Sequence, residues 1–253
     1  MTSWARFSAS FASRLRARLH LSLFKTAYLR ALSELPTITG PAIVVGSAPN
    51  PHPPKGLDDT WFVISVNASQ VTAEQFGLPR PNLTILRDNI FFRGNVSVPT
   101  EIHDALWAAL RGRQTAHAVA IMGSSEDKGA TAQLAIHDYR ADRVTELDRH
   151  VRGAIIVEMS GLSLVGLSAG ISNGIFAALL ALKQGANPVV MSGFSFAPGW
   201  HFAKDVAVPR GHVLPDRAVC KAIVERKLPV FAADPDFARA SGLPLWTGLT
   251  ARP

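Results

Sequence analysis

Short apolar runs alternate with longer amphipathic segments along most of the chain, and this alternation predicts β-strands that alternate with α-helices. The runs that predict strands are residues 41–45, 61–66, 83–86, 117–122, 188–191 and 228–231, with 154–157 as a further candidate. The segments that predict helices are residues 101–111, 175–182, 215–226 and 234–240. Because the strands are apolar throughout, both of their faces are expected to be covered. The pattern therefore predicts an α/β fold, Rossmann-like, with a largely parallel sheet flanked by helices in a single domain.

One charged segment interrupts this alternation. Residues 133–152 carry charges of both signs in close succession, which predicts a helix with a solvated face. His137, Asp138, Asp142 and His150 lie within it, but they do not follow the spacing of metal ligands. We therefore assign no metal site.

A polar turn opens the helix expected at 175–182. Ser172 and Asn173 precede this helix and are of the residue types that cap helix N-termini, and Gly185 follows its end. The strand after the helix ends in Ser192 and Gly193. Since the N–H groups at a helix N-terminus attract anions, the turn is a candidate binding site.

Polar residues also follow the other predicted strands. The first strand leads into the proline-rich loop GSAPNPHPPKG, which begins with Gly46 and Ser47; the second ends at Asn67, and the third at Arg-Asp-Asn, residues 87–89. In open parallel sheets, ligands bind at the carboxyl ends of the strands. The Gly46-Ser47 turn can offer N–H groups and a hydroxyl to a phosphate or a ribose. The sequence has neither the glycine motif of dinucleotide-binding proteins nor the P-loop lysine.

The composition suits one large domain, with 253 residues of which 47% are hydrophobic. The formal charge is +7, and residues 1–36 contribute +5 of it, from six basic residues and one acidic residue. Only +2 remains for the rest of the chain, which argues against a basic face for nucleic acid. We therefore divide the chain into a basic N-terminal segment, 1–36, and a Rossmann-like domain, 37–253, and expect no nucleic-acid partner.

The N-terminal segment predicts a basic amphipathic helix. Phe11, Leu15, Leu19 and Leu23 recur every four positions, with arginines between them. Such a helix suits an anionic membrane surface, while an organelle transit peptide and a plain helix packed on the domain are the alternatives. The expected location is cytoplasmic, and peripheral on the inner face of the cell membrane if the helix makes that contact. The single cysteine, Cys220, fits a reducing compartment and is expected to be buried on a helix.

The segment GLSAG, Gly166 to Gly170, matches the G-x-S-x-G pattern of a hydrolase nucleophile elbow. It makes Ser168 a candidate nucleophile, with His212 as the base and Asp205 as the acid. These two lie only seven residues apart, and no HGGG-type oxyanion loop is present in the sequence. His212 is also a candidate general base on its own, because it lies in a long loop at the ligand edge of the sheet and a free histidine titrates near neutral pH.

Five segments occur in an order that resembles the bacterial sialyltransferase family with a single nucleotide-binding domain, and more distantly the animal sialyltransferases. They are VVGSAPN, FVISVNAS, GISNGIFAALLALKQGANPVVMSGFSF, RGHVLPDRAVCKAI and LPVFAADPDF, within roughly residues 41–245. The resemblance implies a site for a CMP-activated sugar, formed by the turn after the first strand, the ends of later strands and the start of the long helix. These positions are Gly46, Ser47, Pro49, Asn67, Asn89, Ser172, Asn173, Gly174, Ser192 and Gly193.

The same resemblance implies the reaction. The family uses as its catalytic base a histidine shortly before a late helix, and His212 has this place, with Asp216 behind it. The implied activity is an inverting, metal-independent glycosyltransferase that needs no cofactor. It would move sialic acid or a Kdo-type sugar from its CMP donor to a glycan or glycolipid acceptor.

The sequence departs from the family where the leaving phosphate is held. The family has tyrosines after the Ser-Gly strand end, whereas Ala197 stands in the expected place and the only tyrosines are Tyr28 and Tyr139. The loop beyond offers substitutes: Trp200, His201, Lys204 and Arg210. These departures leave the donor sugar open. The alternatives are a serine hydrolase at Ser168, a non-catalytic nucleotide-binding protein of the same fold, and a fold like that of the archaeal-type pterin diphosphokinase.

Overall fold

Seven parallel strands form one sheet in the part of the chain that the computed structural model describes, residues 25–87, 90–91, 100–122, 129–162, 170–197 and 212–248. They are β1 (Ala42–Val45), β2 (Phe62–Val66), β3 (Leu83–Arg87), β4 (Gln114–Met122), β5 (Arg140–Asp148), β6 (Val189–Ser192) and β7 (Val230–Ala232). Their order is β5-β4-β3-β2-β1-β6-β7, and every neighbouring pair is parallel. The α/β fold with a parallel sheet that the sequence predicts is confirmed.

The strand order reverses beside β1. From β1 the chain adds β2 to β5 on one side, and it then crosses back to add β6 and β7 on the other. The carboxyl ends of the paired strands β1 and β6 therefore mark the topological switch point, outside which open α/β sheets bind their ligands.

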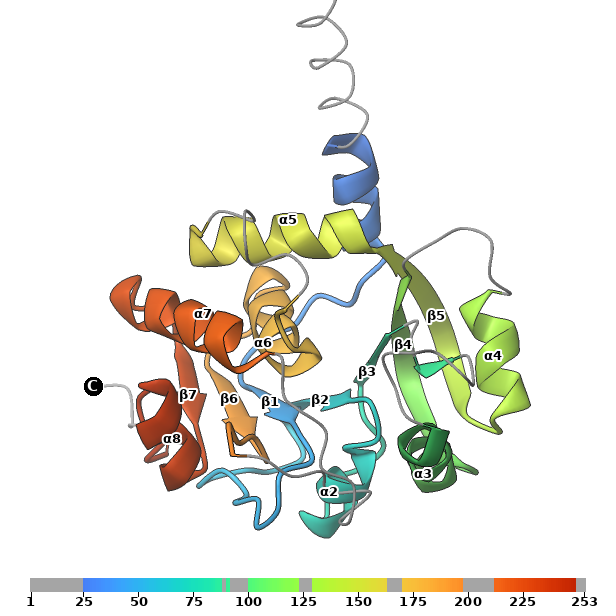
Figure 1. The fold of residues 1–253 in the computed structure, drawn as a ribbon, viewed down its shortest axis with the longest axis horizontal. Helices are drawn as coiled ribbons and strands as arrows, with labels where there is room; N and C mark the ends of the chain where they lie inside the picture. Colours follow the sequence, from blue (N-terminus) through green and yellow to red (C-terminus); the bar gives the residue numbers. More distant parts are fainter. Residues whose placement is uncertain are drawn as a thin grey trace, which may run out of the picture. The chain divides into compact units, whose positions relative to one another are not determined.

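Helices cover both faces of the sheet (Figure 1). On one face lie α5 (Arg149–Ser160), α6 (Asn173–Lys183) and α7 (Val213–Glu225), and on the other lie α2 (Gln70–Gln75), α3 (Thr100–Leu110) and α4 (Ala130–Ile136). The short α8 (Pro235–Ser241) follows β7 and packs against it. Since α6 contacts β1, β2, β3 and β6, it crosses the middle of the sheet and begins near the switch point.

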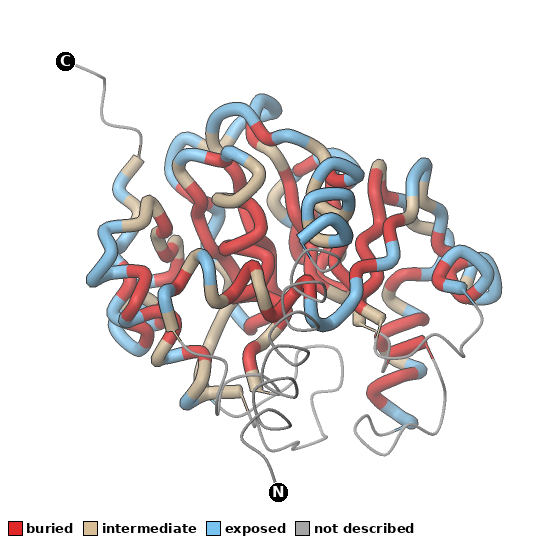
Figure 2. The backbone as a smooth tube through the Cα atoms, turned by 90° about the horizontal axis from the view of Figure 1, so that it is seen from above, coloured by how far each residue is buried: buried red, intermediate tan, exposed pale blue. Residues whose placement is uncertain are grey.

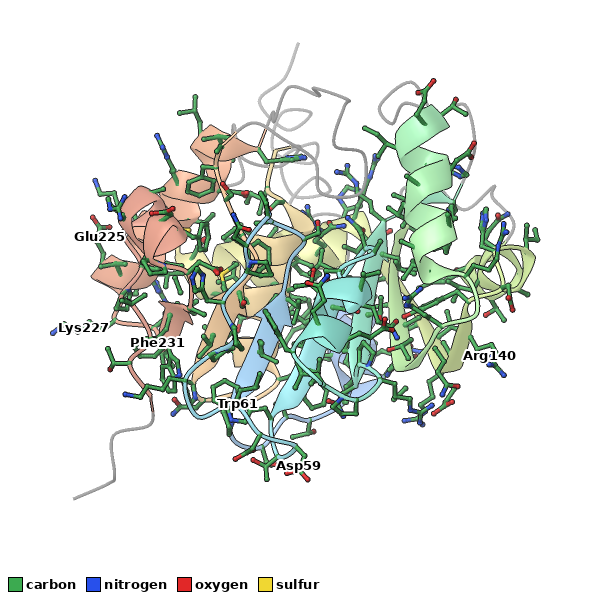
Figure 3. The ribbon with its side chains drawn as sticks, turned by 90° about the horizontal axis from the view of Figure 1, so that it is seen from below. Asp59, Trp61, Arg140, Glu225, Lys227 and Phe231 are labelled. Carbon is green, nitrogen blue, oxygen red and sulfur yellow. The ribbon has the colours of Figure 1, made fainter. Side chains whose placement is uncertain are left out.

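The central strands are apolar because they are covered on both faces. All residues of β1 and β6 are buried, and the buried parts of the chain run through the centre of the molecule with exposed parts around it (Figure 2). Asp59 and Trp61, which precede β2, and Arg140, which starts β5, lie toward the edge where the strands begin (Figure 3). The opposite edge, where the strands end, carries the polar residues considered below. Cys220 is buried on α7, as the sequence predicts.

The charged segment 133–152 is not the single helix that its sequence predicts. The structure divides it among the end of α4, strand β5 and the start of α5. Most residues of β5 remain at least partly exposed, because β5 is the edge strand and pairs only with β4. The strand expected at 154–157 is also wrong, since these residues belong to α5, where Ile155 and Ile156 are buried. A short apolar run does not distinguish a buried helix face from a strand.

Residues 1–36 and 37–253 form separate compact units. In the first unit, residues 25–33 are helical, and Arg30 pairs with Glu34 one turn later (3.1 Å). The apolar positions from Phe11 to Leu23 lie outside the described residues, so membrane contact stays a prediction. Within the described ranges, no helix is both long enough and apolar enough to cross a bilayer.

Candidate functional site

A pocket of about 240 Å³ opens at the carboxyl edge of the sheet, beside the switch point. Residues at or just after the ends of β1, β2, β3 and β6 line it, together with the starts of α6 and α7. Its polar and charged lining residues are Ser47, Asn67, Arg87, Ser172, Asn173, Ser195, His212 and Asp216. Apolar side chains that include Ile90, Leu106, Phe194, Phe196 and Phe237 complete the wall.

Backbone hydrogen bonds hold the turn after β1 to the end of β6. The Gly46 N–H donates to Ser192 O (2.8 Å), and the Ala48 N–H donates to Gly193 O (2.7 Å). A Cβ atom at Gly46 would collide with the Gly193 carbonyl oxygen and lie 2.9 Å from the Phe194 ring. Position 46 therefore requires glycine because the two turns approach so closely.

Two asparagine side chains meet inside the pocket. Asn67 follows β2 in the left-handed conformation (φ 53°), which asparagine tolerates better than most residues, and Asn173 is the first residue of α6. The Asn173 Nδ2 lies 3.4 Å from the Asn67 Oδ1. Asn173 is 8% exposed, and its Oδ1 has no hydrogen-bond partner in the described part of the chain. Because an unsatisfied buried amide oxygen is costly, a ligand that donates a hydrogen bond here would be stabilised.

Ser172 caps α6, as the sequence predicts. Its backbone is extended (φ −66°, ψ 156°), and its Oγ accepts a hydrogen bond from the Ile175 N–H (3.3 Å). Gly174 lies in the first turn, where a Cβ atom would collide with the Phe194 ring. The helix thus presents its positive dipole end to the pocket, and that end favours a negatively charged ligand group.

His212 precedes α7 and is half-buried at the pocket. Its Nδ1 lies 2.7 Å from the Gly170 carbonyl oxygen. A carbonyl oxygen only accepts, so Nδ1 carries the hydrogen and the neutral ring has its lone pair on Nε2. The ring is therefore arranged to accept a proton at Nε2. In a hydrolase triad, by contrast, Nδ1 donates to a carboxylate.

Two buried charged residues, Asp216 and Arg152, lie near His212. Asp216, in the first turn of α7, accepts a hydrogen bond from the Ser172 N–H (2.8 Å). Burial raises the pKa of Asp216 to about 6, although the Ser172 hydrogen bonds and the charges of His212 and Arg152 oppose that rise. Burial, and then the charge of Arg87, lower the pKa of Arg152 to about 10.

The structure brings seven of the ten predicted donor-binding residues to the pocket with His212. These seven are Gly46, Ser47, Asn67, Ser172, Asn173, Gly174 and Gly193. Pro49 is exposed and does not line the pocket. Ser192 is buried, and its hydroxyl donates to the His52 carbonyl (2.6 Å), so it fastens the loop after β1 rather than facing a ligand.

The remaining candidates lie outside the described residues. They are Asp88, Asn89, Ser168, Trp200, His201, Lys204, Asp205 and Arg210. The hydrolase alternative depends on Ser168, so its nucleophile also lies outside the described residues. Ala197 lies at the end of a described segment and is exposed.

Sequence reasoning missed several residues of the site. Arg87 gave a usable signal, since it is a cation at the carboxyl end of a predicted strand. Phe194 and Phe237 gave no signal beyond their apolar character, although the Phe194 ring lies against both Gly46 and Gly174. Arg152 gave none, because it lies in a segment whose charges resemble an ordinary solvated helix face.

In the described ranges, no three His, Cys, Asp or Glu residues are arranged to hold a metal ion. The residues of the charged segment have other contacts. His137 stacks on Trp107 with 4.0 Å between ring centroids, and Asp142 pairs with Arg80 (2.7 Å).

Solved structures of the sialyltransferase CstII have the same fold as this chain. CstII from Campylobacter jejuni in complex with the substrate analogue CMP-3FNeuAc is 13% identical, with a TM-score of 0.50 over 85% of this chain and 88% of that one. One CstII variant in complex with CMP is 12% identical, with a TM-score of 0.50 over 85% of this chain and 89% of that one. A second variant in complex with CMP is 11% identical, with a TM-score of 0.51 over 84% of this chain and 88% of that one. No protein-family model and no curated protein sequence matches the chain. The likeness therefore rests on structure, and this chain has the fold of the CstII sialyltransferases.

Proposed function

We propose that this protein is an inverting, metal-independent glycosyltransferase. It would transfer an acidic sugar, sialic acid or a Kdo-type ulosonate, from a CMP-activated donor to a glycan or glycolipid acceptor. The observation that carries the proposal is the pocket at the switch point, because seven predicted donor-binding residues and the predicted base line it together. The fold shared with CstII, whose solved structures hold CMP and CMP-3FNeuAc, supports the same class of ligand.

The polar groups of the pocket suit such a donor. The Ile175 N–H donates to the Ser172 cap, but the Asn173 and Gly174 N–H groups at the start of α6 have no acceptor within the helix and can bind the phosphate. The amides of Asn67 and Asn173 can hydrogen-bond the ribose or the base. Arg87 adds a positive charge that complements the carboxylate of an acidic sugar.

The proposed reaction uses His212 as a general base. Its Nε2 takes the proton from an acceptor hydroxyl while that oxygen forms a bond to the anomeric carbon of the donor sugar. The bond from the anomeric carbon to the phosphate oxygen breaks on the opposite side, so the configuration inverts and CMP leaves with the electron pair. The α6 N-terminus stabilises the charge that develops on the leaving phosphate, and for this reason we propose that no metal is required.

Calorimetric titration with nucleotides tests the donor site. The purified protein is titrated with CMP, AMP and GMP in the absence of added metal. Selective binding of CMP is expected, because the pocket presents amide groups that distinguish base edges. Equal binding of all three, or no binding, would contradict the proposal.

Replacing the base then tests the reaction. His212→Ala should reduce transfer from a CMP-activated acidic sugar by about 10²- to 10⁴-fold, the usual contribution of a general base, and leave CMP affinity nearly unchanged. His150→Ala is the matched control, since His150 is exposed on α5 and does not line the pocket. Selective CMP binding without transfer from any acidic sugar donor would instead favour the non-catalytic binding protein.

We also propose that residues 1–36 hold the enzyme at an anionic membrane surface, where a glycolipid acceptor would be accessible. The charge of +5 in this segment supports the proposal. The full chain should sediment with anionic vesicles at low salt and less at high salt, whereas a chain of residues 37–253 should not sediment with them. Equal sedimentation of the two chains would contradict this proposal.

A further inference from the structure

The three residues before α6 are each held by a side chain from α5, from α7 or from the residue that precedes α7. In the segment Gly170-Ile171-Ser172, the first carbonyl accepts from His212 Nδ1 (2.7 Å), and the second carbonyl accepts from Arg152 Nη2. The N–H of the third residue donates to Asp216 Oδ1 (2.8 Å). The segment 170–172 therefore takes its position from α5 and α7, which lie with α6 on one face of the sheet (Figure 1).

His212 and Asp216 hold the two ends of this segment as one unit. The Asp216 N–H donates to the His212 carbonyl (2.9 Å), so the two residues are joined by the first turn of α7. The imidazole contacts the near end of the segment, at Gly170, and the carboxylate contacts its far end, at Ser172. If the far end moves, the carbonyl that orients the imidazole moves as well.

We propose that Asp216 is a positioning residue for the base. By holding Ser172 it fixes the Gly170 carbonyl, and this carbonyl keeps the His212 ring with Nδ1 protonated and Nε2 as the proton acceptor. The effect of Asp216 on catalysis rests on the proposed transferase function. Its effect on the His212 tautomer is independent of that function, because the tautomer is a property of the protein without substrate.

Titratable and hydrogen-bonding groups from α5, α7 and the segment 170–172 surround the Asp216 carboxyl. The titratable groups that face it are Arg152 from α5, His212 at the start of α7 and Cys220 one turn further along α7. The Ser172 backbone and side chain both bond to it. Burial raises the pKa of Asp216 to about 6, so at neutral pH it is ionised and accepts the Ser172 N–H strongly.

Two pairs of variants isolate the hydrogen bond between Asp216 and Ser172. Asp216→Ala removes the acceptor, whereas Asp216→Asn keeps an oxygen for the Ser172 N–H. Ser172→Pro removes the N–H, and the native φ of −66° at this position suits proline. Ser172→Ala loses the same hydroxyl cap as Ser172→Pro but keeps the N–H. If Asp216→Ala does not fold, the Ser172 pair alone decides the question.

The tautomer of His212 is the first readout. In long-range ¹H–¹⁵N spectra of ¹⁵N-histidine-labelled protein, with His212→Ala used for assignment, the wild type should show His212 protonated on Nδ1. Asp216→Asn and Ser172→Ala should keep this tautomer, whereas Asp216→Ala and Ser172→Pro should show the mixture typical of an unconstrained imidazole. A folded Asp216→Ala or Ser172→Pro variant that keeps the wild-type tautomer would overturn the proposal.

The kinetic constants are the second readout. Asp216→Ala should lower kcat by about 10²-fold, the scale of a base displaced by about 1 Å, with only a small change in the donor KM. Asp216→Asn should recover most of that loss, and Asp236→Ala, at an exposed residue of α8, should match the wild type. An unchanged kcat in Asp216→Ala, or an equal fall in Asp236→Ala, would overturn the kinetic consequence. Failure of the wild type to bind CMP would remove the proposed function and leave the tautomer result to decide the positioning role.

Discussion

Replacing Gly174 with alanine tests how closely α6 approaches the residues that follow β6. A Cβ atom there would collide with one carbon of the Phe194 ring and lie 2.9 and 3.0 Å from two others, while carbon atoms pack best at about 3.5–4.0 Å. The ring cannot retreat easily, because it also lies against Gly46 and packs on Phe237 with 5.7 Å between centroids. Overpacking of this kind costs about 1–3 kcal/mol, and alanine in a helix offsets about 0.5–1 kcal/mol of that.

We therefore expect Gly174→Ala to lower the free energy of unfolding by about 1–2 kcal/mol. For a domain of this size, the change corresponds to a fall in Tm of about 2–8 °C in calorimetry. CMP affinity should fall too, because the displaced Phe194 ring would move within the pocket that both residues line.

A double-mutant cycle with Phe194→Leu provides the control. The smaller side chain leaves room for the new methyl group, so the double variant should be more stable than the sum of the two single effects predicts, by about 1 kcal/mol. Strict additivity, or a Gly174→Ala variant as stable as the wild type, would refute the contact and the reasoning built on it.

Three further predictions follow from buried groups. Because the pKa of Asp216 is raised from 3.8 to about 6 on folding, the folded chain binds this proton more tightly, and stability falls as the pH rises from about 4 to 6. Asp216→Asn should remove a fall of about 2 kcal/mol between these two pH values, measured by urea unfolding at each of them. Asp234 accepts the His52 backbone N–H on Oδ1 and the Gly193 backbone N–H on Oδ2 (2.7 Å each). Asp234→Asn leaves one of these N–H groups unpaired, so it should lower the free energy of unfolding by about 1–3 kcal/mol in denaturant titrations. His52→Ala keeps both backbone hydrogen bonds and should lower it less. Burial raises the pKa of the Cys220 thiol to about 12, so a thiol reagent at pH 8 should label the protein only after unfolding, and rapid labelling of the native chain would contradict its buried position.

The central strands could be predicted from sequence because their environment is uniform. β1 and β6 are buried on both faces, and such strands appear as unbroken apolar runs that end in small or polar residues. The edge strand β5 could not be predicted in this way. It pairs on one side only, so charged residues such as Arg143 and Glu146 can occupy it, and their density resembles a solvated helix.

The same distinction separates the predictable from the unpredictable parts of the site. The Ser172 cap depends on residues adjacent in sequence, and the chemistry of a helix N-terminus is sufficient to predict it. The place of His212 beside Gly170 depends instead on how α7 packs against the turn before α6, across 42 residues of chain. Arg152 reaches the segment 170–172 from α5 by packing alone, so no local pattern marks it.

The buried polar groups around the pocket lower the stability of the folded chain, and a ligand that pairs with them would offset part of this loss. Asp216 and Arg152 are both buried, and the Arg152 Nε and the Asn173 Oδ1 have no hydrogen-bond partner in the described part of the chain. A protein that has apolar residues of similar size at such positions is often as stable as one that buries charges there, or more stable. A CMP-activated acidic sugar would offset part of this cost, because its amino and hydroxyl groups can donate to Asn173, while its carboxylate complements Arg87 and its phosphate the start of α6. A neutral nucleoside would satisfy the amide but would bring no negative group to the positive dipole end of α6, so this helix end favours the anionic donor over its uncharged parts.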